Sequence, residues 1–135
     1  KQGVEAILIL CTGAFPAFRF SGLLLYPQPI LHKTVEGILP QGRLGILSPA
    51  PQQIPHSRKK WQREGIELVM EAASPYGKGE ELVRAAQRLK EQDPDLIVMD
   101  CIGYNAAMKE EVKAITQKPV VLSNALVARV IRELL

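Results

Sequence analysis

Residues Asp95-Leu96-Ile97-Val98-Met99-Asp100-Cys101-Ile102-Gly103 form an apolar run that begins after an acidic residue and ends in Cys-x-Gly. Residues 5–13 read Glu-Ala-Ile-Leu-Ile-Leu-Cys-Thr-Gly and follow the same pattern. Apolar runs of this length, bounded by polar residues and glycine, are typical of strands buried on both faces of a parallel sheet. The match between the two segments indicates an internal repeat.

Strands and helices are predicted to alternate along the rest of the chain. Apolar runs predict strands at residues 23–25, 44–47, 66–72, 96–101 and 119–122. The intervening segments predict helices at residues 30–39, 49–64, 79–91, 105–116 and 124–135. Strands joined by helices imply right-handed crossovers and a parallel sheet. The predicted fold is therefore α/β, with a parallel sheet as the middle of three layers.

We expect a domain junction near Gly42. Residues 1–42 would form the end of a truncated N-terminal α/β domain and a connector, and residues 43–135 a C-terminal α/β domain. A helix is predicted before the second copy of the repeat, whereas the first copy follows Lys1-Gln2-Gly3 directly. By this parallel, we expect a missing N-terminal region to precede the chain.

Composition and charge narrow the class of protein. The chain has 135 residues, of which 47% are hydrophobic and 23% charged, as in a globular protein with one core. The net charge of +3 is mild, and we interpret Arg58-Lys59-Lys60 as a solvated helix face, so no nucleic acid partner is expected. No apolar segment reaches the ~18 residues that cross a membrane. Two cysteines fit a reducing compartment, so a cytoplasmic protein is expected.

Motifs for bound cofactors are missing from the sequence. It contains no Cys-x-x-Cys, His-Glu-x-x-His, phosphate-binding Gly-x-x-x-x-Gly-Lys or Gly-x-Ser-x-Gly. We therefore predict no metal site and no cofactor.

Polar and small residues follow nearly every predicted strand. Ligands of open α/β sheets bind beyond the carboxyl ends of the strands, where backbone N–H groups of the next helix favour an anion. Each hydroxyl or amide could instead be an ordinary helix cap, but together they predict a site for a small carboxylate. The candidate residues are Cys11, Thr12, Gly13, Ser48, Ser74, Tyr76, Cys101, Gly103, Ser123 and Asn124.

Two thiols at equivalent strand ends suit proton transfer. One thiolate can remove a proton from the carbon beside a carboxylate while the other thiol returns a proton to the opposite face, because cysteine titrates near pH 8.5. The alternation of a strand should direct Asp100 to the face opposite Cys101. Either cysteine could instead be a small buried apolar residue.

The segments 71–76, 95–104 and 119–129 resemble the AroM family. The resemblance covers nearly the whole chain and implies the C-terminal part of a longer protein. It also implies kinship with the aspartate/glutamate/hydantoin racemase superfamily, in which two similar α/β halves each supply one cysteine to a site between them. Cys11 and Cys101 match those positions, and Thr12, Ser123 and Asn124 would hold the substrate carboxylate.

These inferences predict an enzyme, a cofactor-independent racemase or isomerase of a small carboxylate with Cys11 and Cys101 as its acid/base pair. One alternative is an inactive ligand-binding or regulatory protein on the same scaffold. Another is a decarboxylase or cis-trans isomerase that uses a single cysteine. Association into a homo-oligomer is left open.

Overall fold

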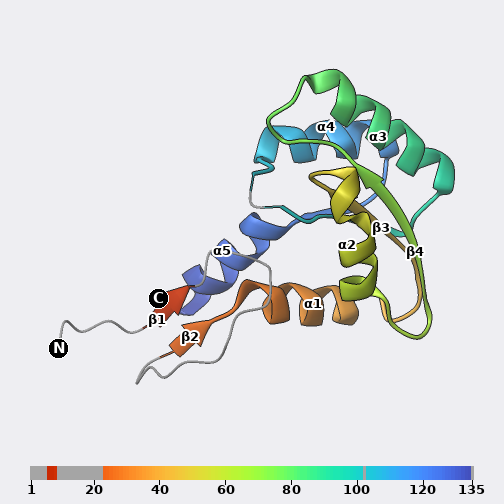
Figure 1. Ribbon diagram of the computed structural model, residues 1–135. Coiled ribbons are helices and arrows are strands. Elements are labelled where there is room, and N and C mark those ends of the chain that lie inside the picture. Colours follow the sequence, from red (N-terminus) through yellow and green to blue (C-terminus); the bar gives the residue numbers. More distant parts are fainter. Residues whose placement is uncertain (1–5, 9–22, 102, 135) are drawn as a thin grey trace.

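A computed structural model of the chain describes residues 6–8, 23–101 and 103–134 (Figure 1). Its centre is a parallel sheet of four strands in the order β4-β3-β5-β6. A second parallel pair joins β1 (Ala6–Leu8) to β2 (Leu23–Leu25). The strands of the central sheet are β3 (Gly42–Ser48), β4 (Ile66–Ala72), β5 (Leu96–Met99) and β6 (Val120–Leu122). The predicted α/β fold with a parallel sheet is confirmed.

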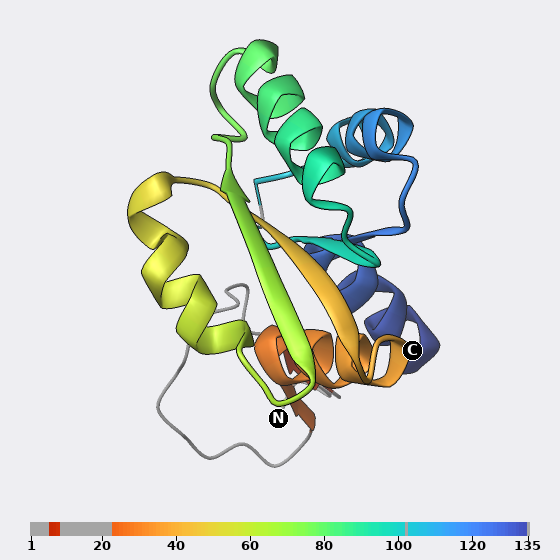
Figure 2. The same cartoon turned by 90° about the vertical axis from the view of Figure 1, so that its right-hand side faces the viewer.

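Helices cover both faces of the central sheet, which gives the three predicted layers (Figures 1 and 2). Helices α3 (Gly79–Gln92) and α4 (Ala106–Thr116) lie on one face. The other face carries α1 (Pro27–Ile38), α2 (Ile54–Trp61) and α5 (Ser123–Leu134), with a short 3₁₀ turn, η1 (Pro51–Gln53), before α2. None of these described helices has the length and apolar character needed to cross a membrane.

Several element boundaries differ from the sequence-based expectation. Helix α1 begins at Pro27 instead of Ile30, because proline is well tolerated in the first turn of a helix, where its missing N–H is not needed. Helix α2 ends at Trp61 instead of Glu64, because Gln62 adopts an extended conformation with ψ of 131°. Strand β5 also ends at Met99, two residues before the predicted end at Cys101.

The central sheet separates two hydrophobic clusters. Ile97 and Met99 of β5 pack with α3 and α4, while Leu96 and Val98 pack with α1 and α2. All four side chains are buried, as expected for a strand covered on both faces. Burying each such side chain contributes roughly 1.5–3 kcal/mol to folding.

Helix α1 shares its core with the central sheet. Leu31 and Val35 belong to the same cluster as Ile46 and Val98, although α1 precedes the junction predicted at Gly42. The packing of α1 thus joins residues from both sides of Gly42. The division into domains 1–42 and 43–135 stays a prediction.

Polar residues meet where the central strands end. The register pairs Leu47 with Met99 and Met99 with Leu122, so the residues that follow, Ser48, Asp100 and Ser123, are neighbours. The Asp100 N–H donates to the Leu47 carbonyl oxygen at 3.0 Å, which extends the sheet by one more contact. We call this side of the sheet, formed by the ends of β3, β4, β5 and β6, the carboxyl edge.

At the opposite edge, the start of β3 requires glycine. Gly42 has φ of +135°, and a Cβ atom there would lie 2.6 Å from Asp95 Oδ2. We predict that Gly42→Ala lowers the free energy of unfolding by at least about 1–3 kcal/mol, the usual cost of such a conformation. Gly37→Ala is the matched control, because a Cβ there meets nothing within 4 Å and alanine favours the helix. Urea titrations of both variants would contradict the account if Gly42→Ala were as stable as Gly37→Ala.

Candidate functional site

The carboxyl edge places Cys101 in a tight turn after β5. Cys101 is a free, half-buried thiol that packs against the cluster beneath α3 and α4. The Gly103 N–H donates to Cys101 Sγ at 3.3 Å, and the Tyr104 N–H donates to the Cys101 carbonyl oxygen at 3.3 Å. A backbone N–H directed at sulfur stabilises a thiolate more than a neutral thiol. Cys11, Thr12 and Gly13 lie outside the described residues.

The loop after β4 lies beside this turn. A Cβ atom on Gly103 would be 2.8 Å from both Pro75 Cγ and Tyr76 Oη, so only glycine allows the two loops to approach this closely. Tyr76 is 83% exposed, while Pro75 is buried. The structure therefore brings Tyr76, Gly103 and Cys101 together, as the sequence predicts for neighbouring strand ends.

Ser74 shapes the loop that carries Tyr76. Its N–H donates to Glu81 Oε2 at 2.7 Å, and its Oγ accepts from the Tyr76 N–H at 3.1 Å. Glu81 belongs to the first turn of α3, so this helix fixes the loop. Both polar groups of Ser74 thus have partners within the protein.

Tyr104 ties several strand ends together beneath the site. Its buried hydroxyl donates to two carbonyl oxygens, that of Ser48 at 2.8 Å and that of Ala73 at 2.6 Å. The two oxygens share the single hydroxyl proton. The Asn124 side chain donates from Nδ2 to the Tyr104 carbonyl oxygen at 3.2 Å. Burial raises the pKa of Tyr104 well above its ordinary value of 10.0, and the nearby charges of Cys101, Glu81 and Asp100 act in the same direction.

Two other candidate residues are enclosed in the fold. Ser48 is fully buried and its Oγ bonds with Ser57 Oγ of α2 at 3.1 Å. Ser123 begins α5 with 1% of its surface exposed, and its Oγ has no hydrogen-bond partner among the described residues. Neither hydroxyl is hydrogen-bonded to the described residues of the turn that carries Cys101.

The structure adds a buried polar cluster around Asp100, which we call the Asp100 cluster and define as His32, Lys60, Trp61 and Asp100. Trp61 Nε1 donates to Asp100 Oδ2 at 2.8 Å, and Lys60 Nζ lies 2.9 Å from the same oxygen. The Asp100 side chain is 1% exposed and that of Lys60 is 11% exposed. His32 of α1 stacks on Trp61 with 4.0 Å between ring centroids.

The Asp100 cluster corrects one interpretation of the sequence. Arg58 and Lys59 are exposed as predicted, but the inclusion of Lys60 in a solvated helix face is wrong. Lys60 Nζ lies beside Asp100 at the carboxyl edge, where the carboxylate supplies the opposite charge. Ser57 and Trp61 are buried and lie one turn apart on α2. Their i, i+4 spacing is the feature of the sequence that indicates a buried helix face next to Lys60.

Burial lowers the pKa of His32 below its ordinary value of 6.5, and the positive charge of Lys60 contributes in the same direction. The negative charges of Asp100 and Glu36 oppose this shift. His32 Nε2 is buried without a hydrogen-bond partner in the described part of the chain, so a proton there would find no acceptor. The folded protein therefore favours neutral His32.

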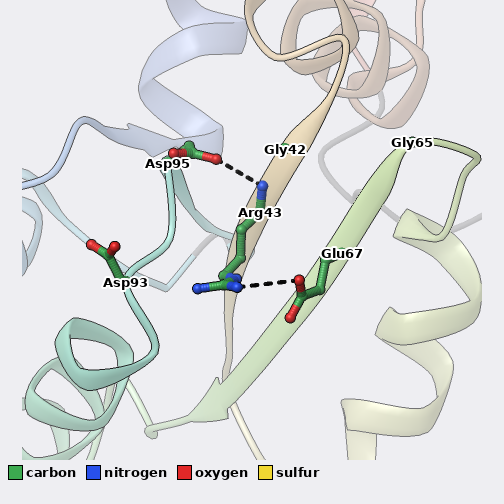
Figure 3. A pocket seen from close by; sticks show the side chains of 6 residues that line it. All are labelled: Gly42, Arg43, Gly65, Glu67, Asp93 and Asp95. Atoms are coloured by element: carbon green, nitrogen blue, oxygen red, sulfur yellow. Dashed lines mark hydrogen bonds and ion pairs between the residues drawn. The ribbon is translucent and has the colours of Figure 1, made fainter.

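A charged hollow lies at the amino ends of the strands, away from Cys101 (Figure 3). Arg43 donates from its backbone N–H to Asp95 Oδ2 at 2.8 Å, and its guanidinium contacts Glu67 at 3.3 Å. These charges are partners of one another, which indicates a structural role. The lining residues are Gly42, Arg43, Gly65, Glu67, Asp93 and Asp95.

Comparison with known proteins identifies the family. The family model described as AroM protein matches residues 1–135, the whole chain. The chain belongs to the AroM family. No curated protein matches it. Among the described residues of this AroM family member, no three His, Cys, Asp or Glu side chains are grouped as metal ligands.

Removing the Tyr104 hydroxyl should weaken the carboxyl edge. We predict that Tyr104→Phe lowers the free energy of unfolding by about 1–3 kcal/mol, because the Ala73 carbonyl loses a buried donor. Because the pKa of Tyr104 is raised by folding, its contribution to stability is fully present below pH 10. Above pH 10 this contribution falls, because the Tyr104 hydroxyl ionises first in the unfolded state. Denaturant titrations from pH 8 to 11 should show a weaker alkaline loss in Tyr104→Phe. The exposed control Tyr76→Phe should behave as wild type.

The lowered pKa of His32 predicts a loss of stability in mild acid. Above pH 6.5 His32 is neutral in both states, and as the pH falls the unfolded chain takes up its proton first, so the folded state is destabilised. His32→Phe keeps an aromatic ring on Trp61 and should flatten the dependence of unfolding on pH between 7 and 5. Urea titrations followed by Trp61 fluorescence measure this effect. An equal flattening in the exposed control His56→Phe would contradict the assignment.

Proposed function

We propose that this AroM family member is a cofactor-independent racemase or isomerase of a small carboxylate, with Cys101 as one acid/base group and Cys11 as the other. The observation that supports this most is the contact between the Gly103 N–H and Cys101 Sγ. It supplies a donor to a half-buried sulfur at the edge of the sheet where ligands of this fold class bind.

In the proposed reaction the Cys101 thiolate removes the proton from the carbon beside the substrate carboxylate. The electron pair left on that carbon is delocalised into the carboxylate as an enediolate. The Cys11 thiol then donates a proton to the opposite face, which inverts the stereocentre. The reverse reaction begins with the two cysteines in the opposite protonation states, so no external acid, base or oxidant is consumed.

Substrate binding at this edge draws on several groups. Tyr76 offers an exposed hydroxyl and ring next to Gly103, so a ligand above the turn would contact it. Helices α4 and α5 both begin at this edge, where their first N–H groups favour a carboxylate. Asn105 Oδ1 accepts from the Met108 N–H, so one donor in the first turn of α4 already has a partner. Asn124 and Ser123 belong to the first turn of α5.

Each general acid or base step contributes about 10²–10⁴-fold to a rate. We therefore predict that Cys101→Ser and Cys11→Ser each lower turnover at least about 100-fold. A set of chiral 2-substituted carboxylates in D₂O would be screened by NMR for deuterium entry at the carbon beside the carboxylate, and by circular dichroism for inversion. Glu110→Gln, an exposed substitution on α4, is the control and should retain wild-type rates.

The same screen separates the alternatives. A rate close to wild type in either single-cysteine variant would overturn the two-thiol mechanism. Turnover that requires Cys101 but tolerates loss of Cys11 would indicate a decarboxylase or isomerase with a single thiol. Carboxylate binding with no exchange in the wild-type protein would indicate a ligand-binding scaffold.

A further inference from the structure

Two consecutive residues leave β5 towards opposite faces of the central sheet. Asp100 continues the alternation of Leu96 and Val98 and meets α2, whereas Cys101 continues that of Ile97 and Met99 and packs beneath α3 and α4. The carboxylate and the thiol are therefore separated by the backbone of one peptide unit. The Asp100 side chain is almost entirely buried, so solvent screens its charge only weakly.

A bare carboxylate at this position would oppose a thiolate on Cys101, since like charges disfavour each other's charged form. Lys60 Nζ lies 2.9 Å from Asp100 Oδ2, and both side chains are nearly excluded from solvent. Ion pairs in such surroundings are only weakly screened by salt. An ammonium at this distance offsets the charge of the carboxylate that precedes the thiol in the sequence.

The same contacts hold the backbone of the turn. Lys60 and Trp61 are consecutive residues at the end of α2, and both bind Asp100 Oδ2. One turn earlier, Ser57 Oγ bonds with Ser48 Oγ at the end of β3. The Asp100 N–H is in turn bonded to the Leu47 carbonyl oxygen. Helix α2 is therefore connected to the ends of β3 and β5, and the turn of Cys101 follows β5 directly.

We propose that the buried Lys60–Asp100 ion pair is a positioning device for the Cys101 thiol, which neutralises the adjacent carboxylate and anchors the turn from the opposite face of the sheet. The inference rests on the proposed role of Cys101 as a reactive thiol. Lys60 and Asp100 act through the peptide backbone and through charge, so they are positioning residues. The function requires the pair because Asp100 alone would suppress the thiolate.

Two other titratable groups near the turn are Glu81 of α3 and Tyr104, which lies between β5 and α4. The charges of Cys101, Glu81 and Asp100 each raise the pKa of Tyr104. His32 stacks on Trp61, the residue next to Lys60. Glu81, Tyr104 and His32 are unchanged in all the variants below, so differences between the variants report on Lys60 and Asp100.

The test measures the rate at which iodoacetamide alkylates Cys101, by peptide mass spectrometry, across pH 6–10. In Lys60→Met the uncompensated carboxylate should raise the pH midpoint of the reaction and slow alkylation at pH 7.5 about three- to tenfold. Asp100→Asn should have the opposite effect and speed it by a similar factor. Lys60→Met combined with Asp100→Asn should return the midpoint close to that of wild type.

Matched variants separate charge from folding. Lys59→Met removes an exposed charge from the adjacent position and should leave the midpoint unchanged. Lys60→Arg keeps the charge and should stay close to wild type. If Lys60→Met does not fold, Asp100→Asn and the double variant carry the test, since Asp100→Asn removes the carboxylate alone and the double variant removes both charges.

Equal midpoints in wild type, Asp100→Asn and the double variant would overturn the proposal. This readout needs no substrate. A slow, unresponsive thiol in every variant would count against the proposed function as well, whereas a fast thiol that ignores these substitutions would count against the positioning role alone.

Discussion

The carboxylate of Asp100 joins helix α2 to the end of β5, directly before the turn on which the candidate site is built. Its oxygen Oδ2 accepts from Trp61 and pairs with Lys60, so the end of α2 is fixed to the end of β5. Removing one partner of a buried ion pair typically costs about 3–5 kcal/mol, because the other charge stays buried without compensation. The position of the next residue, Cys101, therefore depends on contacts made on the opposite side of the sheet.

The other side of the turn is held by neutral contacts. Tyr104 binds the carbonyl oxygens at the ends of β3 and β4, and Gly103 lies against Pro75. These groups carry no charge in the folded protein near neutral pH. The arrangement fixes the backbone of the turn while the thiol itself stays half-buried. A reactive thiol requires both properties, because it must be oriented and must also be reached by its substrate.

The sequence predicts the central sheet well because its strands are buried on both faces. The strand predicted at 66–72 is β4 as observed, and the helix predicted at 79–91 is α3 with Leu82, Ala85, Ala86 and Leu89 buried. Local patterns also predict that Tyr76, Cys101 and Gly103 meet, since parallel strands end at one edge. Sequence cannot reveal the partner of Lys60, because a lysine in a basic run is buried only where the tertiary fold supplies an opposite charge.

The most direct test of the account compares the reactivity of Cys101 in the folded chain with its reactivity in urea. The rate of alkylation by iodoacetamide would be measured at pH 7 under both conditions, with peptide mass spectrometry to follow this thiol alone. The account predicts that Cys101 reacts several-fold faster in the folded protein, because the Gly103 N–H stabilises the thiolate and Lys60 neutralises Asp100. Slower alkylation in the folded protein would identify Cys101 as an inert structural residue and contradict the account.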